Sequence, residues 1–333
     1  MAKTVTGKVE QEEEGTAFVA PQNNYSFSDR PAKAGNLATG TVKTITSLAN
    51  PIIKDLRALA LKKYRERERL FIAEGLKLVL EGLELGHKIR YLIYADRGES
   101  ANLAEQAAAR SLSAGALVIK ANAKIMAAIT HRDNAQNIIG VFEQQWYGLE
   151  QILQGQAPRA YAENRPARPG KKNAGKTVQP RLFLALDRVR DPGNLGTIIR
   201  TADAAGVSGL VLVGDTTSPF ALEAVRATMG SIFAVPLCRL SQPQFLQKMH
   251  NFAGQIIGTY LHGGADYRIL PYFESGKDIM LLMGNEQQGL ADSLVQACSA
   301  LARIPQTGRA DSLNLAVSAG IMLYEICRNR LTL

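Results

Sequence analysis

From Arg181 onward, short hydrophobic runs alternate with segments of helical periodicity, and this alternation restricts the fold more than any other feature. The expected strands cover residues 181–186, 210–213, 232–236, 255–260, 278–283 and 300–304. Helices are expected between or after them at residues 197–205, 221–228, 245–252, 291–298 and 312–328. Strands that alternate with helices form parallel sheets with helices on both faces. We therefore expect an α/β domain with a parallel sheet over residues 181–330.

A smaller α/β pattern precedes this domain. Strands are expected at residues 70–73, 89–94 and 116–119, and helices at residues 51–60, 75–85 and 101–113. This order predicts a small α/β sandwich, with helices packed on a sheet, over residues 47–145. Within it, Lys62 to Arg69 form a run of mixed charge, which by spacing alone indicates a solvated helix end.

Two segments lack the apolar residues needed to fold alone. Residues 1–46 are rich in Gly, Thr, Glu, Gln and Asn, and are predicted to be a disordered tail. Residues 146–180 are rich in proline, glycine and basic residues, and are predicted to be a basic linker. The linker either serves as a solubilising tether or contacts phosphates without sequence preference, and both interpretations stay open.

The formal charge of +9 favours a polyanionic partner such as nucleic acid or an anionic membrane, although charge alone does not decide. The N-terminus has no apolar signal region, and no uncharged apolar run reaches the roughly 18 residues of a membrane span. We therefore expect a soluble, cytoplasmic protein without a membrane partner.

The cysteines and histidines give no metal signal. Cys238, Cys298 and Cys327 form no C-x-x-C pair and have apolar neighbours, which is typical of buried free thiols in a reducing compartment. The four histidines are scattered without ligand spacing, so no metal site is expected.

Three polar, glycine-rich loops follow expected strands, where ligands bind in open parallel sheets. The first, residues 187–200, contains a Pro-Gly turn that leads into a helix. Asn194 is expected to cap backbone amides there, and Arg200, about one turn into the helix, to reach back toward the loop. The G-x-x-G spacing fits neither a dinucleotide loop nor a P-loop, so a structural turn and a ligand loop stay equally open.

The other two loops have similar alternatives. In residues 281–290, Gly284 permits close approach of a ligand to the backbone, while Glu286 also suits an ordinary helix entry. In residues 303–314, the loop ends in a capped helix, and Ser312 taken alone is expected to be its N-cap.

Taken together and in this order, the three loops resemble the signature motifs of the SpoU/TrmH family in the SPOUT superfamily of methyltransferases. The matching residues are Asn194, Gly196 and Arg200, then Gly284, Glu286 and Gly289, then Ile304, Pro305, Ser312, Leu313 and Asn314. Arg226, Thr228 and Gly230 resemble a further helix end of the family. Gln306 is a departure, because the family often has methionine there.

The first domain resembles the substrate-binding domain of the same family. The likeness rests on Asn50, Pro51, Ile53, Lys54, Leu56, Lys63, Arg65, Phe71, Glu74 and Gly75.

The resemblance implies a C-terminal segment threaded into a trefoil knot, knot loops that bind S-adenosylmethionine, and catalytic domains paired as a homodimer. The expected cofactor contacts are Gly284, Ile304 and Leu313. The expected catalytic residues are Asn194, Arg200, Glu286, Ser312 and Asn314. The expected RNA contacts are Lys62, Lys63, Arg65, Lys171 and Lys172.

The implied reaction is methylation of a ribose 2′-hydroxyl of RNA. Arg200 either takes the hydroxyl proton or binds a phosphate and favours the alkoxide electrostatically. The second role suits arginine better, because the guanidinium stays protonated in proteins.

The extra N-terminal domain favours large-subunit ribosomal RNA as the substrate, since tRNA-directed relatives usually lack such a domain. The alternatives are a tRNA 2′-O-methyltransferase and a non-catalytic RNA-binding protein on the same fold. A nicotinamide-dependent oxidoreductase is disfavoured, because the dinucleotide fingerprint is missing.

Overall fold

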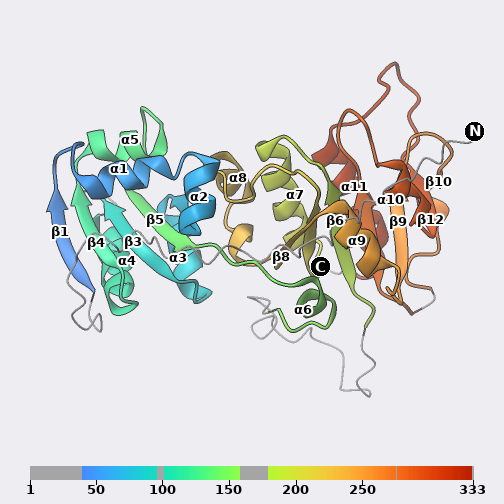
Figure 1. Ribbon diagram of the computed structural model, residues 1–333, viewed down its shortest axis with the longest axis horizontal. Helices are drawn as coiled ribbons and strands as arrows, with labels where there is room; N and C mark the ends of the chain where they lie inside the picture. The colour runs from blue at the N-terminus through green and yellow to red at the C-terminus, as the bar shows by residue number, and fades with distance from the viewer. Residues whose placement is uncertain (1–39, 96–100, 158–178, 275, 332–333) are drawn as a thin grey trace, which may run out of the picture. The chain divides into compact units, whose positions relative to one another are not determined.

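The computed structural model describes residues 40–95, 101–157, 179–274 and 276–331 (Figure 1). These residues belong to one unit, Asn36–Leu333. Most of the predicted tail lies outside the described residues, as do Lys171 and Lys172 of the predicted linker.

The C-terminal half contains a seven-stranded sheet in the order β10-β12-β9-β11-β6-β7-β8, and every neighbouring pair is parallel. The strands are β6 (Leu182–Asp187), β7 (Leu210–Val213), β8 (Leu237–Leu240), β9 (Gln255–Thr259), β10 (Ala265–Asp266), β11 (Ile279–Met283) and β12 (Ala300–Arg303). The helices are α7 (Pro192–Ala204), α8 (Leu222–Thr228), α9 (Gln242–Met249), α10 (Asp292–Gln296) and α11 (Leu315–Cys327). The predicted α/β domain with a parallel sheet is confirmed.

Both faces of the central strands are buried, which explains their continuous apolar sequences. Along β6, Leu184 and Leu186 belong to one core cluster, together with residues of α7 and α11. Their neighbours Phe183 and Ala185 belong to a second cluster, together with residues of α9 and α10. Because successive side chains of a strand point to opposite faces, one apolar run supplies two cores.

The strand predicted at residues 232–236 is wrong. Ser231–Phe233 form a 3-10 helix, η1, and β8 begins only at Leu237. Met229 and Gly230 have φ values of 52° and 112°, so the backbone turns sharply after α8. The apolar residues that follow pack into the core without joining the sheet, and Phe233 is 4% exposed.

The N-terminal half contains a five-stranded sheet in the order β1-β4-β3-β5-β2. The strands are β1 (Thr41–Ile45), β2 (Leu70–Glu74), β3 (Ile89–Tyr94), β4 (Leu117–Ala121) and β5 (Ile138–Glu143). The helices are α1 (Pro51–Ala58), α2 (Lys62–Glu68), α3 (Leu76–Glu84), α4 (Ala101–Ser113) and α5 (Ala123–Thr130). The sheet is mixed, because β5 runs antiparallel to both β2 and β3 while β1, β3 and β4 are parallel.

Two ordered elements lie in segments that were predicted to be unstructured. β1 falls in the predicted tail and pairs with β4 from Thr41↔Leu117 to Ile45↔Ala121. Four of its five side chains are exposed, so backbone pairing and not an apolar pattern places this strand. The helix α6 (Leu149–Leu153) falls in the predicted linker and buries Leu149 and Ile152 in the second core cluster.

The two halves share one apolar core. Phe71 of β2 lies 4.8 Å from Phe220, measured between ring centroids, and Phe142 of β5 lies 4.9 Å from Phe233. A polar contact accompanies these rings. Arg226 of α8 pairs with Glu74 of β2 at 2.6 Å.

The anchoring of Arg226 extends to the end of α5 and to the chain that follows it. Its Nη2 atom donates to the Thr130 carbonyl at 2.8 Å. Glu74 in turn accepts a hydrogen bond from the Gln136 amide at 3.1 Å. The Arg226–Glu74 contact gives a structural role to two residues that the family resemblance included without assigning them one.

Candidate active site

The three glycine-rich loops meet at one edge of the C-terminal sheet. β6, β11 and β12 lie in one parallel sheet, so their carboxyl ends face the same way. Leu282 of β11 and Leu301 of β12 both pair with Gly258 of β9. Gly284 and Ile304 therefore follow their strands at similar heights on that edge.

A chain of amide hydrogen bonds connects the three loops. Asn314 Nδ2 donates to Asn194 Oδ1 at 3.0 Å, and Asn194 Nδ2 donates to Glu286 Oε1 at 3.0 Å. Asn314 Oδ1 accepts from the Ala316 amide at 2.9 Å, so the Asn314 nitrogen is left to face Asn194. These hydrogen bonds therefore run in one direction, from Asn314 through Asn194 to the exposed Glu286 carboxylate, which is the final acceptor.

The helix that carries Asn194 begins earlier than predicted. α7 starts at Pro192, and Asp191 is its N-cap, because the Asp191 carboxylate accepts from the Asn194 amide at 2.5 Å. Asn194 is therefore inside the first turn and does not cap it, which leaves its side chain available for the other loops. An aspartate followed by proline is a helix-start signal that explains the correction.

Arg200 and Ser312 lie outside this amide chain. Because α7 begins at Pro192, Arg200 is more than two turns into the helix and not about one turn. Its side chain is exposed and makes no hydrogen bond or ion pair with the described residues. Ser312 is also exposed and contacts Asp311 Oδ1 at 3.5 Å.

Asn314, and not Ser312, is the N-cap of α11. The Asn314 side chain accepts from two backbone amides of the first turn, whereas Ser312 lies two residues before the cap. The structure thus brings together Asn194, Glu286 and Asn314 of the predicted catalytic residues.

The loop after β11 leaves no room for a side chain at its first residue. A β-carbon on Gly284 would lie 2.1 Å from the Gly289 carbonyl carbon. Two backbone hydrogen bonds between Asn285 and Gly289 close this loop, at 3.1 and 2.9 Å. Glycine is therefore required at position 284 by the path of the chain itself.

The predicted cofactor residues suit S-adenosylmethionine. Gly284 offers backbone groups, Ile304 is half-buried, and Leu313 is an apolar side chain that is 37% exposed. Apolar surface with a few backbone groups fits an adenosyl group, and no basic side chain stands among the three to oppose a sulfonium. With its amide group turned so that the nitrogen faces the backbone, Gln306 donates to the Ala310 carbonyl at 3.0 Å, a contact within the third loop.

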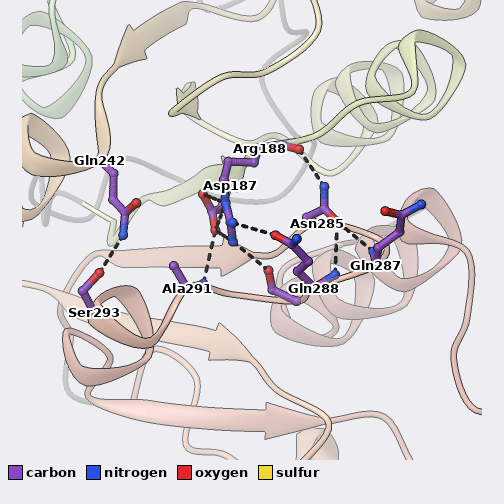
Figure 2. A network of polar contacts seen from close by, with 9 residues as sticks. Asp187, Arg188, Gln242, Asn285, Gln287, Gln288, Ala291 and Ser293 are labelled. Atoms are coloured by element: carbon purple, nitrogen blue, oxygen red, sulfur yellow. Dashed lines mark hydrogen bonds and ion pairs between the residues drawn. The ribbon is translucent and has the colours of Figure 1, made fainter.

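A second polar network joins the Gly284 loop to the end of β6 (Figure 2). It joins Asp187 and Arg188, at the end of β6, to Asn285 and Gln288 in the loop. All four residues lie in the loops described from the sequence, but nothing in their spacing assigned them a role. The sequence signal that could have found them is Asp187, a carboxylate at the last position of a fully buried strand.

The predicted RNA contacts on α2 separate into two groups. Lys62 and Lys63 are exposed, and Lys62 lies 3.9 Å from Asp215. Asp215 also pairs with Arg190 at 3.0 Å, so α2 lies beside the loop that carries the first motif.

Arg65 is not an available RNA contact, and its prediction is corrected. The Arg65 side chain is buried and donates to the Leu59 carbonyl at 2.8 Å and to the Ala60 carbonyl at 2.5 Å. Burial lowers the pKa of its guanidinium, an effect that the charge of Glu66 opposes. Arg65 therefore closes the turn between α1 and α2.

Two features are absent from the described residues. No three His, Cys, Asp or Glu side chains in that part of the chain gather as metal ligands. None of the described helices is long and apolar enough to cross a bilayer.

Burial raises the pKa of the Cys238 and Cys298 thiols to about 12, so these thiols stay protonated.

Comparison with known proteins identifies the family. The chain matches the SpoU rRNA Methylase family over residues 181–324 and the MRM3-like substrate binding domain over residues 50–140. It is 30% identical over 285 residues to the 23S rRNA (guanosine(2553)-2′-O)-methyltransferase RlmP of Bacillus subtilis (strain 168), covering 86% of this chain and 99% of RlmP. The chain belongs to the SpoU rRNA methylase family. The resemblance stated from the sequence is therefore confirmed.

Solved structures agree with this assignment. The SpoU-family chain is 48% identical to the AdoMet-bound rRNA methyltransferase from Sinorhizobium meliloti, with a TM-score of 0.76, covering 88% of this chain and 100% of that chain. It is 25% identical to the SpoU methyltransferase AviRb from Streptomyces viridochromogenes in complex with AdoMet, with a TM-score of 0.67 and 84% and 98% coverage. The predicted α/β SPOUT fold class is thereby supported over nearly the whole length of both structures.

Proposed function

We propose that this SpoU-family protein transfers the methyl group of S-adenosylmethionine to a ribose 2′-hydroxyl of large-subunit ribosomal RNA. The observation that carries the proposal is the hydrogen-bonded chain Asn314–Asn194–Glu286, which brings the three motifs of the family into one site. Similar proteins support the substrate and the cofactor: RlmP is a 23S rRNA 2′-O-methyltransferase, and the structures from Sinorhizobium and Streptomyces are methyltransferases with AdoMet bound.

The protein's contribution is alignment and charge. S-adenosylmethionine supplies an electrophilic methyl group when bound, and Gly284, Ile304 and Leu313 are the residues that would hold it. Asn194 and Asn314 orient the Glu286 carboxylate, which can accept a hydrogen bond from a ribose hydroxyl. A guanidinium is a poor general base, so we assign Arg200 to a phosphate or to the developing alkoxide rather than to proton removal. Ser312 lies at the same loop and completes the proposed catalytic set.

The RNA is held, in this proposal, by the domain over residues 47–145 and by the linker over residues 146–180. Lys62 and Lys63 are exposed cations of α2, and Lys171 and Lys172 add positive charge from the linker. Contacts to phosphates from such residues weaken as salt rises. A steep fall of RNA affinity between low and moderate salt is the expected signature.

We also propose a homodimer with a trefoil-knotted catalytic domain over residues 181–330, located in the cytoplasm, where ribosomal RNA is modified. α11 supports the dimer, because its large hydrophobic side chains Val317 and Tyr324 are 52% and 49% exposed. Exposed apolar groups on one helix favour a covered surface. Light scattering during gel filtration tests the mass, and a monomer at micromolar concentration would contradict the dimer.

The decisive experiment is methylation of RNA from a strain that lacks the protein. The purified chain is incubated with radiolabelled S-adenosylmethionine and total RNA, and labelled nucleotides are mapped after nuclease digestion. Label on a ribose 2′-oxygen of 23S-type RNA is expected. Label on a base overturns the ribose chemistry, and label confined to tRNA overturns the substrate.

Two variants of Arg200 then test its role. Arg200→Ala is expected to abolish turnover, since the positive charge is lost. Arg200→Lys keeps the charge but loses the planar guanidinium, so a large loss in this variant supports bidentate binding. Methylation by Arg200→Ala at the normal rate would remove Arg200 from the catalytic set.

A further inference from the structure

Asp187 and Arg188 form a pair at the carboxyl end of β6 (Figure 2). Asp187 is fully buried, and its carboxylate accepts from Arg188 Nε at 3.0 Å and from Arg188 Nη2 at 2.9 Å. This two-pronged contact fixes the plane of the guanidinium. The orientation of the other N–H groups of the Arg188 guanidinium is thereby fixed.

The backbone of Arg188 has an uncommon conformation that helps to orient its side chain. Its φ is 52°, in the left-handed region that few residues other than glycine adopt. The Arg188 amide donates to the Val213 carbonyl at 3.0 Å, which joins the turn to the end of β7. A β-carbon on Gly214 would lie 3.2 Å from Arg188 Cγ, so the neighbouring glycine leaves space for the arginine stem. Strained residues of this kind concentrate at functional sites.

The Nη1 and Nη2 atoms of Arg188 also contact the loop that carries Gly284 and Glu286. Arg188 Nη1 donates to Gln288 Oε1 at 2.9 Å, and Nη2 approaches the Gly289 carbonyl at 3.4 Å. In the opposite direction, Asn285 Nδ2 donates to the Arg188 carbonyl at 2.9 Å. Arg188, which directly follows β6, therefore contacts the loop both at Asn285 and at Gln288 and Gly289.

Asp187 holds the far end of the same loop. Its Oδ2 accepts from the Ala291 amide at 3.3 Å, immediately before α10. Residues 286–289 are exposed, and apart from the hydrogen bond from Asn194 to Glu286 the other hydrogen bonds of residues 285–289 are local ones around Asn285. The loop would have few constraints on its position without the contacts to Asp187 and Arg188.

We propose that Asp187 and Arg188 are positioning residues that hold the loop over residues 284–291 in the shape required to bind S-adenosylmethionine. The inference rests on the proposed function, because it assigns a cofactor to that loop. Arg188 acts through the loop and does not touch the reacting atoms. Its guanidinium already contacts Asp187, Gln288 and Gly289, so it is not available to bind a phosphate of RNA.

Cofactor affinity in the absence of RNA tests the proposal. Calorimetry with S-adenosylmethionine compares the full-length wild type with Arg188→Gln, which shortens the side chain and removes its charge. A Kd raised by about tenfold or more is expected, equivalent to about 1.4 kcal/mol per tenfold. Arg190→Gln is the matched control, since Arg190 lies two residues away and pairs with Asp215 instead of the loop.

Hydrogen exchange without any ligand supplies a readout that does not depend on binding. The amides of residues 285–291 are expected to exchange faster in Arg188→Gln, while the central strands β6 and β11 keep their protection. If Arg188→Gln fails to fold, Gln288→Ala removes the loop's side of the contact and leaves the buried pair intact. Gln288→Ala is expected to show the same two changes in smaller measure.

The outcomes separate the two ideas. Wild-type affinity together with unchanged exchange in Arg188→Gln, or in Gln288→Ala if only that variant folds, overturns the positioning role. A wild-type protein that binds no S-adenosylmethionine overturns the proposed function instead. Arg188→Lys restores charge without the planar group, so partial recovery of affinity supports the assigned geometry.

Discussion

Arg226→Met is expected to destabilise the protein strongly, because it leaves a buried carboxylate without its partner. Only 2% of the Glu74 side chain and 25% of the Arg226 side chain are exposed, and the two groups lie 2.6 Å apart. Removing one member of a buried ion pair costs about 3–5 kcal/mol. Glu74 keeps the Gln136 amide and Arg226 is partly exposed, so we expect the lower end, about 3 kcal/mol.

Urea unfolding followed by circular dichroism measures this loss as a shift in midpoint at unchanged slope. The matched control is Arg190→Met, because Arg190 and Asp215 are 65% and 70% exposed at a distance of 3.0 Å. Exposed pairs contribute about 0–1 kcal/mol, so the control should unfold almost like the wild type. In a Glu74→Gln background, Arg226→Met should cost much less. A loss below about 1 kcal/mol in the single variant, or full additivity of the two changes, would refute the reasoning.

Three further predictions follow from the site and the core. Asn314→Asp keeps the acceptor that caps α11 but loses the donor to Asn194, so single-turnover methylation should fall about 10- to 100-fold with RNA affinity unchanged; an unchanged rate would exclude the amide chain from catalysis. Burial lowers the pKa of His87, against the opposing effect of its hydrogen bond to the Phe233 carbonyl. The unfolded chain then binds the proton more readily, so stability should fall as pH drops below about 6.5, and His87→Gln should flatten that acid-side loss of Tm. Because burial raises the pKa of Cys238 to about 12, this thiol should resist iodoacetamide at pH 8 until the protein is unfolded, as mass spectrometry would show.

The sequence predicted the central part of the fold well because the residues there leave few choices. β6, β7 and β11 are short apolar runs buried on both faces, and such runs between helical segments have one common arrangement. The pattern therefore predicts that the loops after β6, β11 and β12 lie at one edge of the sheet. The contact between Asn194, Glu286 and Asn314 follows from that placement.

Other elements could not be predicted, because local pattern does not determine them. The run around Phe233 is apolar enough for a strand, but its side chains fill the core between the two halves as part of a 3-10 helix. The basic run on α2 gives no signal for which arginine turns inward, and Arg65 does so to satisfy backbone carbonyls. Arg188 owes its importance to a positive φ and to a loop 100 residues away in sequence, neither of which spacing reveals.

The pairing of β1 with β4 determines where this chain can be shortened. The match to the substrate-binding domain begins at residue 50, and a fragment cut there would lose β1. The edge of β4 from Leu117 to Ala121 would then present unpaired amide and carbonyl groups to any other strand in solution. A fragment intended for crystallisation should therefore begin before Gly40, whose amide donates to the Leu112 carbonyl at 3.3 Å, so that the sheet keeps its own edge strand and does not recruit one from a neighbouring molecule.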